Sequence, residues 1–373
     1  MQVQKPVIIK AQLLSPLSVG DGNALSPLAD YFVQNGYLHY ISPDRLETYL
    51  DENQLITAYV KAVRSAVNVA KDSFWEDTLQ MDDLDLISSG RKARIYVKDN
   101  PTEVKTIVRN GNAPYLPGST VKGAFKTALL YGWLFQQDKR ELKNLLRHIS
   151  EFKGFDIEKQ LDSLLNSRFN EKGVMPDFHH LRVSDSSLFS DSDVEVLMSK
   201  RLHLIKGTFD IPIAREAIVA PNKVFGIPVT LYPQFQHSSL QFLNKDGLKG
   251  MFKMINDFSL DHLGWLLDEV EASRQDIEKG TPGMYNPLFS WLDNLYKDVE
   301  KASDDECFIQ LGAGKTYFAN SIGLAIRNND RRDFDKWRKI LRLGKLEKEF
   351  YPVTISIDQE RSAPLGWSML KLG

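Results

Sequence analysis

The sequence predicts an α+β protein with strands and helices in both halves of the chain. Short runs of β-branched and aliphatic residues, typical of strands, occur at 7–14 and again at 307–311. Longer segments whose apolar residues recur at helical spacing lie between such runs, for example at 247–273. A chain of 373 residues is also long enough for two domains of ordinary size. We therefore expect two mixed units, with domains at 1–200 and 201–373.

In the first half, Ser15-Pro16 stops the first strand, and a glycine-bearing loop follows. Asn35-Gly36 is a typical two-residue turn of a β-hairpin. The elements expected up to residue 200 are strands at 7–14, 30–33, 37–41, 94–97, 104–108 and 179–186, and helices at 45–69, 142–149 and 157–169.

The second half repeats this mixture of strands and helices. We expect strands at 201–206, 211–219, 225–231, 307–311, 353–357 and near Trp367, and helices at 247–273, 288–302 and 337–343.

Composition indicates a globular protein of aqueous compartments. Hydrophobic residues make up 42% and charged residues 26% of the chain, and no apolar run approaches the roughly 18 residues of a membrane span. The first residues lack a secretory pattern, so we expect the cytoplasm and no membrane. The single cysteine, Cys307, excludes an intrachain disulfide and a cysteine-rich zinc site.

Charge is segregated along the chain although the net charge is only -2. Basic residues dominate 91–126 and recur at 327–348, whereas 72–85 and 298–306 are acidic. This pattern predicts one basic and one acidic face.

The segment 114–136 is organised as an anion-binding helix start. Pro117-Gly118 predicts a turn, and Ser119 or Thr120 could cap the helix that the following apolar residues predict. Lys122 and Lys126 lie one turn apart near the positive end of the helix dipole. Ordinary helix capping explains the same pattern, so phosphate binding and a purely structural role both remain open.

Gly314-Lys315-Thr316 has the ending of a nucleotide-binding P-loop but not its spacing. The first glycine of that motif would fall on Ile309, and no doubly wound pattern surrounds it. The turn could still let an RNA backbone approach, with Lys315 as the counter-charge. Its structural alternative is a tight turn packed against the other half of the chain.

Two further groups could carry chemistry. His179 and His180 could form a metal site or an acid-base pair for RNA cleavage, but neighbouring strand residues point to opposite faces and cannot readily share a metal. Asp21 and Asp30 could hold Mg²⁺, although turn formation explains them equally well. We therefore expect no catalytic or metal-binding residues and no cofactor.

Four segments follow one another in a characteristic order. They are Ser-Pro-Leu-Ser-Val-Gly-Asp-Gly at 15–22, residues 115–129, Leu-Arg-Val-Ser-Asp-Ser at 181–186, and Leu-Gly-Ala-Gly-Lys at 311–315. Together they resemble the RAMP superfamily of CRISPR-associated proteins. Their order, the chain length and the ending Pro364-Leu365-Gly366-Trp367 resemble the fifth-subunit family of type III-A (Csm) effector complexes. The most specific segment is Leu-Pro-Gly-Ser-Thr-Val-Lys-Gly-Ala-Phe-Lys-Thr-Ala, and the glycine-rich segment is a weakened form of the family signature.

This resemblance implies two ferredoxin-like, RRM-like domains with helical insertions, and a subunit without target cleavage of its own. Its implied partners are the 3′ portion of the CRISPR RNA, the repeated backbone RAMP subunit and other Csm subunits, with no small-molecule substrate. A guide-processing endoribonuclease is the alternative. The residues expected to contact RNA are Gly20, Gly22, Gly118, Ser119, Thr120, Lys122, Gly123, Lys126, Gly312, Gly314 and Lys315.

Overall fold

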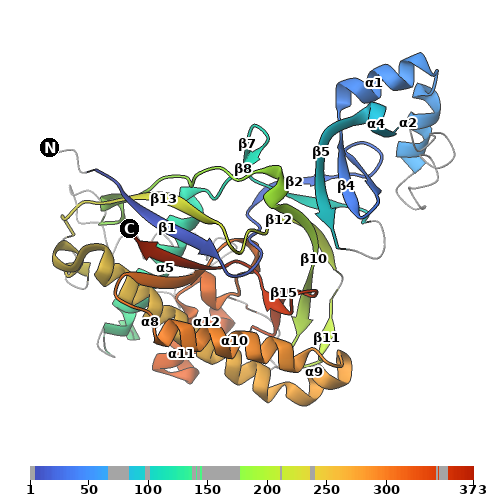
Figure 1. Ribbon diagram of the computed structural model, residues 1–373. Coiled ribbons are helices and arrows are strands. Elements are labelled where there is room, and N and C mark those ends of the chain that lie inside the picture. Colours follow the sequence, from blue (N-terminus) through green and yellow to red (C-terminus); the bar gives the residue numbers. More distant parts are fainter. Residues whose placement is uncertain are drawn as a thin grey trace.

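The computed structural model describes residues 5–65, 84–96, 101–136, 140, 143–144, 177–210, 212–235, 240–341, 343 and 352–373. Within them the chain forms an α+β fold with two main sheets (Figure 1). The α+β class expected from the sequence is thereby confirmed. The helices expected at 142–149 and 157–169 lie outside the described residues, apart from 143–144.

The five-stranded sheet has a ferredoxin-like arrangement. Its order is β14-β17-β1-β13-β9, with antiparallel neighbours throughout. In chain order, β1, the helix α5, β9, β13, the helix α8 and β17 make the βαββαβ pattern, with insertions between them. The bounds are β1 Val7–Leu13, β9 Leu181–Val183, β13 Val224–Leu231, β14 Glu306–Gln310, β17 Trp367–Leu372, α5 Gly118–Gln136 and α8 Leu243–Ala272.

The helices cover one face of this sheet because its strands alternate between buried and exposed residues. In β1, Ile9, Ala11 and Leu13 are buried, whereas Ile8 and Lys10 are exposed. Phe125 and Phe252, from α5 and α8, are fully buried in the same core. The backbone of α8 is broken at Gly247, where φ is 57°.

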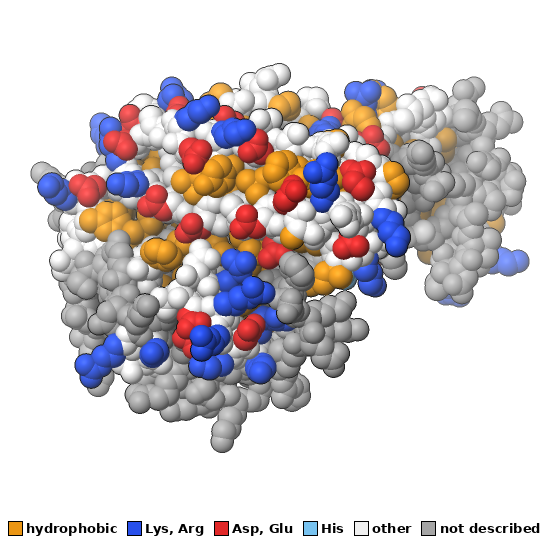
Figure 2. Space-filling model, turned by 90° about the horizontal axis from the view of Figure 1, so that it is seen from below, with side chains coloured by type: hydrophobic (Ala, Val, Ile, Leu, Met, Phe, Trp, Pro, Cys, Tyr) orange, Lys and Arg blue, Asp and Glu red, His pale blue; other side chains and the backbone are white. Residues whose placement is uncertain are grey.

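Further helices extend this layer: α9 Arg274–Gly280, α10 Tyr285–Glu300, α11 Gly323–Asn329 and α12 Arg331–Leu341, with short 3-10 turns at Gly312–Gly314 and Phe318–Asn320. Seen from their side, the coloured part of the surface shows acidic and basic side chains interspersed with apolar ones (Figure 2). None of the helices in the described residues is long and apolar enough to cross a membrane.

The ten-stranded sheet is built from the insertions. Its main path is β2-β6-β12-β10-β5-β4-β3, and β11, β15 and β16 join beside β10. The bounds are β2 Gly20–Leu25, β3 Tyr31–Gln34, β4 Tyr37–Ile41, β5 Ser88–Ile95, β6 Val104–Ile107, β10 Val194–His203, β11 Thr208–Phe209, β12 Ile213–Ile218, β15 Thr354–Asp358 and β16 Ala363–Pro364. A separate small hairpin pairs β7 Arg109–Asn110 with β8 Ala113–Pro114.

The far end of this sheet carries its own small core. The helices α1 Pro43–Glu52, α2 Ile56–Ser65 and α4 Leu84–Ile87 pack there, away from α8–α12 (Figure 1). Leu46, Leu50 and Ile87 are buried against Phe32 of β3. The single helix expected at 45–69 is therefore two helices up to residue 65, separated at Gln54, where φ is 57°.

The position of the domain boundary stays a prediction. Residue 200 lies inside β10, and β1 pairs with β13 and β17 from the other half of the chain. Strands from both sides of residue 200 therefore share each of the two main sheets. The first and the last strand, β1 and β17, accordingly lie side by side (Figure 1).

Candidate nucleic-acid interface

Hydrogen bonds join the start of α5 to the segment after β9. The Leu116 N–H donates to Ser186 Oγ over 2.9 Å, and the Ser186 N–H donates to the Leu116 carbonyl over 3.0 Å. The Gly118 N–H donates to Asp185 Oδ1 over 2.8 Å. Two of the four RAMP-like sequence segments thus form one structural unit.

At Gly118 a backbone approaches closely, as the sequence predicts, but this backbone belongs to the chain itself and not to an RNA. A Cβ atom at this position would lie 2.4 Å from the Val183 carbonyl oxygen and 2.7 Å from that of Ser184. This packing explains the glycine without any ligand. Gly123, one turn further along α5, is exposed and has open space around it.

Three cations gather beside the first turns of α5: Lys122, Lys126 and Arg182 of β9. Burial first, and then the neighbouring charges of Lys126 and Arg182, lower the pKa of Lys122. The Lys126 ammonium lies 5.5 Å from the ring centre of Phe178, and the Arg182 guanidinium 5.2 Å from that of Tyr232. Like charges repel, so an anion bound here would be stabilised by all three.

Ser119 and Thr120, the residues expected to cap α5, lie inside the helix and not before it. The helix starts at Gly118, and Asp185 accepts the Gly118 N–H. Ser119 is exposed and Thr120 is half-buried. The sequence argument missed both Asp185 and Arg182 as members of this site. Their only signal was the segment 181–186, which is part of the family resemblance.

The glycine-rich segment forms a second cluster with residues near both termini. The Ala313 N–H donates to the Ser18 carbonyl over 2.8 Å, and the Gly366 N–H to that of Pro16 over 2.9 Å. A Cβ on Gly314 would lie 2.4 Å from the Leu365 carbonyl oxygen, and Gly312 has a φ of 72°. These glycines thus permit tight packing within the chain.

Lys315 follows this cluster in extended conformation, with φ -64° and ψ 134°. It is half-buried, and burial lowers its pKa. The preceding residues Gly312–Gly314 form a 3-10 turn, and Lys315 itself does not begin a helix. This is not the loop-to-helix geometry of a P-loop.

Gly20 and Gly22 lie in β2, where a loop was expected. Gly22 has a φ of 91° and open space around it, next to a register shift in the pairing with β6. Asp21 Oδ1 accepts hydrogen bonds from the Asn23 N–H and Thr106 Oγ1, and Asp30 Oδ2 accepts one from the Ser26 N–H. Asp30 therefore supports a local turn, and Asp21 supports both a local turn and the contact between β2 and β6.

The expected RNA contacts are not brought to one place. The residues from Gly118 to Lys126 lie at the β9 edge of the five-stranded sheet, and Gly312–Gly314 follow β14 at the opposite edge. Four strand spacings separate these edges, or about 19 Å. Any RNA that contacts both groups must therefore span this sheet.

The two histidines differ in how far their side chains are exposed to solvent. His179 is exposed, whereas His180 is 5% exposed and lies 5.8 Å from the ring centre of Phe235. Within the described ranges, no group of three or more His, Cys, Asp and Glu side chains is placed to hold a metal ion.

Part of the basic run at 91–126 is neutralised internally. Arg91 and Arg109 both form ion pairs with Asp191 at 3.0 Å, and Arg109 forms another with Glu216. Lys105 pairs with Glu103. The cations at α5 therefore differ from the first part of the run, because Lys122 is surrounded by like charge.

Comparisons with known proteins agree on one family. A family model described as the RAMP superfamily matches residues 10–319. The chain is 24% identical to the CRISPR system protein Csm5 of Methanocaldococcus jannaschii, over 98% of this chain and 88% of that protein. Its fold is similar to a chain of a Csm–crRNA–target RNA ternary complex from a type III-A CRISPR-Cas system, with a TM-score of 0.70, 20% identity and coverage of 98% and 100%. It is also similar to T. onnurineus Csm5, with a TM-score of 0.63, 19% identity and coverage of 96% and 99%.

Proposed function

The chain belongs to the RAMP superfamily, and from this premise we propose that it is an RNA-binding subunit of a type III-A (Csm) complex. In this proposal it works in the cytoplasm and caps the filament at the 3′ portion of the CRISPR RNA, beside the repeated backbone subunit. It supports assembly and guide maturation and does not cleave the target itself.

The observation that carries the proposal is the group of Lys122, Lys126 and Arg182 at the start of α5. Burial and the neighbouring charges of Lys126 and Arg182 disfavour the charged form of Lys122 and lower its pKa, and a polyanion bound here would offset this effect. Cations that meet phosphates position an RNA without reading its sequence. That behaviour suits a subunit that must hold guides of many sequences.

The similar solved structures support CRISPR RNA and Csm subunits as the partners of this chain. One of them is a chain of a Csm complex with crRNA and target RNA, and it matches this chain over almost its whole length. The glycines at 118, 312 and 314 contribute by packing within the chain, which shapes the surfaces on which the RNA would lie.

The test is the double substitution Lys122→Ala and Lys126→Ala. We expect RNA affinity to fall about equally for different sequences, and the slope of log affinity against log salt to become less steep by about one to two units. Fluorescence anisotropy at several salt concentrations measures both quantities.

The matched control is Lys249→Ala with Lys253→Ala, the same spacing on α8. Lys249 there forms an ion pair with Asp305, and the charge of Lys253 acts on Asp257. We expect this control to bind RNA as the unsubstituted protein does. A salt slope left unchanged by the α5 variant, with its fold intact, would refute the assignment of the site.

Exposure of His179 beside the α5 site favours one second candidate, an endoribonuclease that processes the guide precursor. His179 lies on the same 3-10 turn, Asp177–His180, as Phe178, whose ring faces Lys126. Labelled precursor RNA is incubated with the protein, with and without chelator. Clean cleavage that His179→Ala abolishes would establish the enzyme; RNA that is bound but left intact supports the scaffold.

A further inference from the structure

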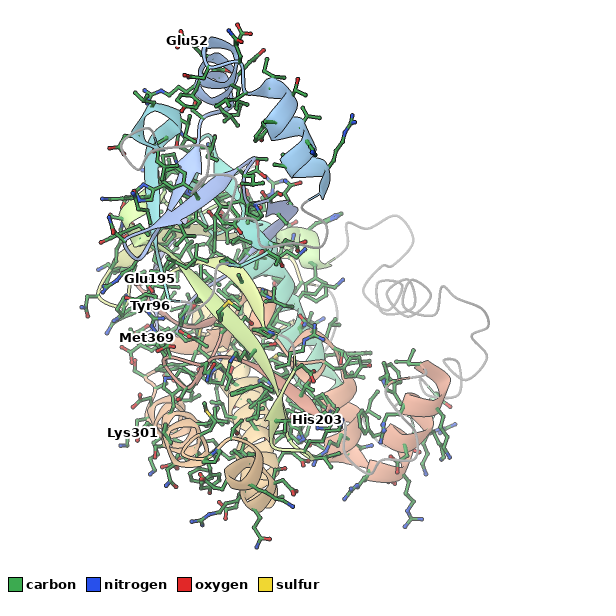
Figure 3. The ribbon with its side chains drawn as sticks, turned by 90° about the vertical axis from the view of Figure 1, so that its right-hand side faces the viewer. Glu52, Tyr96, Glu195, His203, Lys301 and Met369 are labelled. Atoms are coloured by element: carbon green, nitrogen blue, oxygen red, sulfur yellow. The ribbon has the colours of Figure 1, made fainter. Side chains whose placement is uncertain are left out.

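The outer face of the ten-stranded sheet carries arginines from three strands. In β10 the residues Val196 and Leu202 point into the main core, so Glu195, Leu197 and Arg201 lie on the other side. On that side Leu197 is buried in a small cluster with Ala217 and Leu365, whereas Arg201 is exposed. Arg215 of β12 is paired with Leu197, and Arg94 of β5 with Glu195. Because paired residues share a face, Arg94, Arg201 and Arg215 lie on the same side of the sheet. Figure 3 shows the length of β10 from Glu195 to His203.

Arg215 is half-buried without a counter-charge among the described residues. Its Nε is fully buried and donates to no acceptor there, and no carboxylate lies within ion-pair distance. Burial, and then the charge of Arg201, lower its pKa. A guanidinium nevertheless stays protonated in proteins, so the charge persists in an unfavourable place.

Two other arginines, Arg109 and Arg361, form ion pairs among the described residues, unlike Arg215. Arg109 forms ion pairs with Asp191 and Glu216. Arg361 forms them with Glu195 and Asp358, at 2.6 Å in both cases. Glu195 and Asp358, which lie on the same face of the sheet as Arg201, are thus already paired with Arg361. Arg201 is exposed and, like Arg215, has no acidic partner in the described part of the chain.

Aromatic rings continue the same face toward β4. The Arg94 and Arg361 guanidinium groups lie 5.0 and 5.5 Å from the ring centre of Tyr96. Beyond them, Lys92 lies 4.8 Å from the ring centre of Tyr37, which is 37% exposed. Tyr96 and Glu195 lie next to each other on the side of the molecule in Figure 3. Cations interleaved with rings are what single-stranded nucleic acid binds.

We propose that Arg201 and Arg215 bind a backbone phosphate of single-stranded RNA on the outer face of the ten-stranded sheet, and that the strand continues past Arg94 to stack a base on Tyr37. This inference rests on the proposed RNA-binding function, but it concerns a different sheet from the α5 site. The phosphate would meet the terminal nitrogens of the Arg215 guanidinium, which unlike Nε are not among the buried unpaired atoms, and would offset the unpaired charge of the group. Arg94 and Arg215 are two strands apart, about 10 Å, which a strand of RNA crosses within a few nucleotides.

The experiment compares Arg201→Gln with Lys200→Gln in the full-length protein. Both changes remove one positive charge from adjacent residues of β10, but Lys200 lies on the opposite face, against the ring of Phe209. We expect Arg201→Gln to weaken binding of a fluorescent single-stranded RNA about tenfold and to make the salt slope about 0.7 less steep. Lys200→Gln should change neither quantity.

Two further variants test phosphate binding by Arg215 and base stacking on Tyr37 separately. Arg215→Lys keeps the charge but removes the planar fork, and should also weaken binding. Tyr37→Ala should weaken binding of an ordinary strand but not of an abasic one, which has no base to stack. Thermal unfolding of each variant, matched to the unsubstituted protein, shows that the fold is intact.

The outcomes separate this inference from the function on which it rests. If the unsubstituted protein binds no RNA, the proposed function fails. A second outcome is that the protein binds RNA and that Lys122→Ala with Lys126→Ala lowers the RNA affinity. If Arg201→Gln and Lys200→Gln then have equal RNA affinities, only the outer-face site is refuted. If only the Arg201 and Arg215 variants lose RNA affinity, the outer-face site is supported and the α5 site is refuted.

Discussion

At the scale of single residues, two glycines on α5 have opposite structural environments. Gly118 is pressed against the backbone of Val183 and Ser184, whereas Gly123 faces open space. Their conservative substitutions should therefore differ in sign. The pattern of small residues in the sequence could not distinguish the two, because the backbone that approaches Gly118 belongs to a segment 65 residues away.

We expect Gly118→Ala to destabilise the protein by about 1–3 kcal/mol or more, because the added methyl group would overlap a carbonyl oxygen. Gly123→Ala should stabilise it by up to about 1 kcal/mol, since alanine favours the helix and meets no neighbour. Denaturant unfolding measures both. Equal effects of the two substitutions would contradict the packing described for Gly118.

Lys122 should make RNA binding sensitive to alkaline pH. Because its pKa is lowered, its ammonium loses the proton at a lower pH than an exposed lysine does. RNA affinity should therefore fall as pH rises through this lowered pKa, before ordinary lysines titrate. In Lys122→Arg the charge persists, so this part of the fall should vanish. Titrations from about pH 7 to 10 measure it; an unaltered profile in the arginine variant would count against a role for Lys122.

At the scale of elements, one buried charge network ties the small hairpin β7–β8 to the ten-stranded sheet. Arg109 of β7 bonds Glu216 of β12 at 3.0 Å, and the Ile107 N–H donates to the same carboxylate at 3.1 Å. The Tyr40 hydroxyl of β4 donates to it as well. Glu216 is only 1% exposed, so these partners offset the cost of burying its carboxylate.

Glu216→Ala should cost about 3–5 kcal/mol of stability, because it leaves Arg109 half-buried without that partner. Glu103→Ala breaks a pair in which both side chains are about half exposed, and should cost less than about 1 kcal/mol. Denaturant midpoints of the two variants give the comparison. Similar losses would show that the network adds no more than a surface ion pair.

The hairpin β3–β4 and the helix α5 show how much single elements follow from local sequence. Asn35 and Gly36 have φ of 51° and 77°, the backbone that a tight two-residue turn requires, and the predicted hairpin is confirmed. The predicted helix after Pro117 is confirmed too. Both depend on neighbours in the chain, which a sequence displays directly.

At the scale of the whole molecule, strand pairing makes the two halves of the chain depend on each other. β1 lies between β13 and β17, and β5 of the first half pairs with β10, which spans residue 200. The fragments 1–200 and 201–373 should therefore lack cooperative unfolding when produced separately. Calorimetry of each fragment tests this. Sharp, independent transitions would instead support two autonomous domains with a boundary near residue 200.

The sequence by itself determined the α+β class, the hairpin at Asn35-Gly36, the helix start after Pro117 and the family resemblance, because each rests on residues close together in the chain. Only the tertiary structure decided that Arg182 joins Lys122, that Asp185 accepts the Gly118 N–H, and that Arg201 and Arg215 share one face of the ten-stranded sheet. Those relations arise from strand order and register, which bring distant residues together. In the segment 114–136, the lysines remain the predicted anion contacts, whereas packing within the chain explains Gly118.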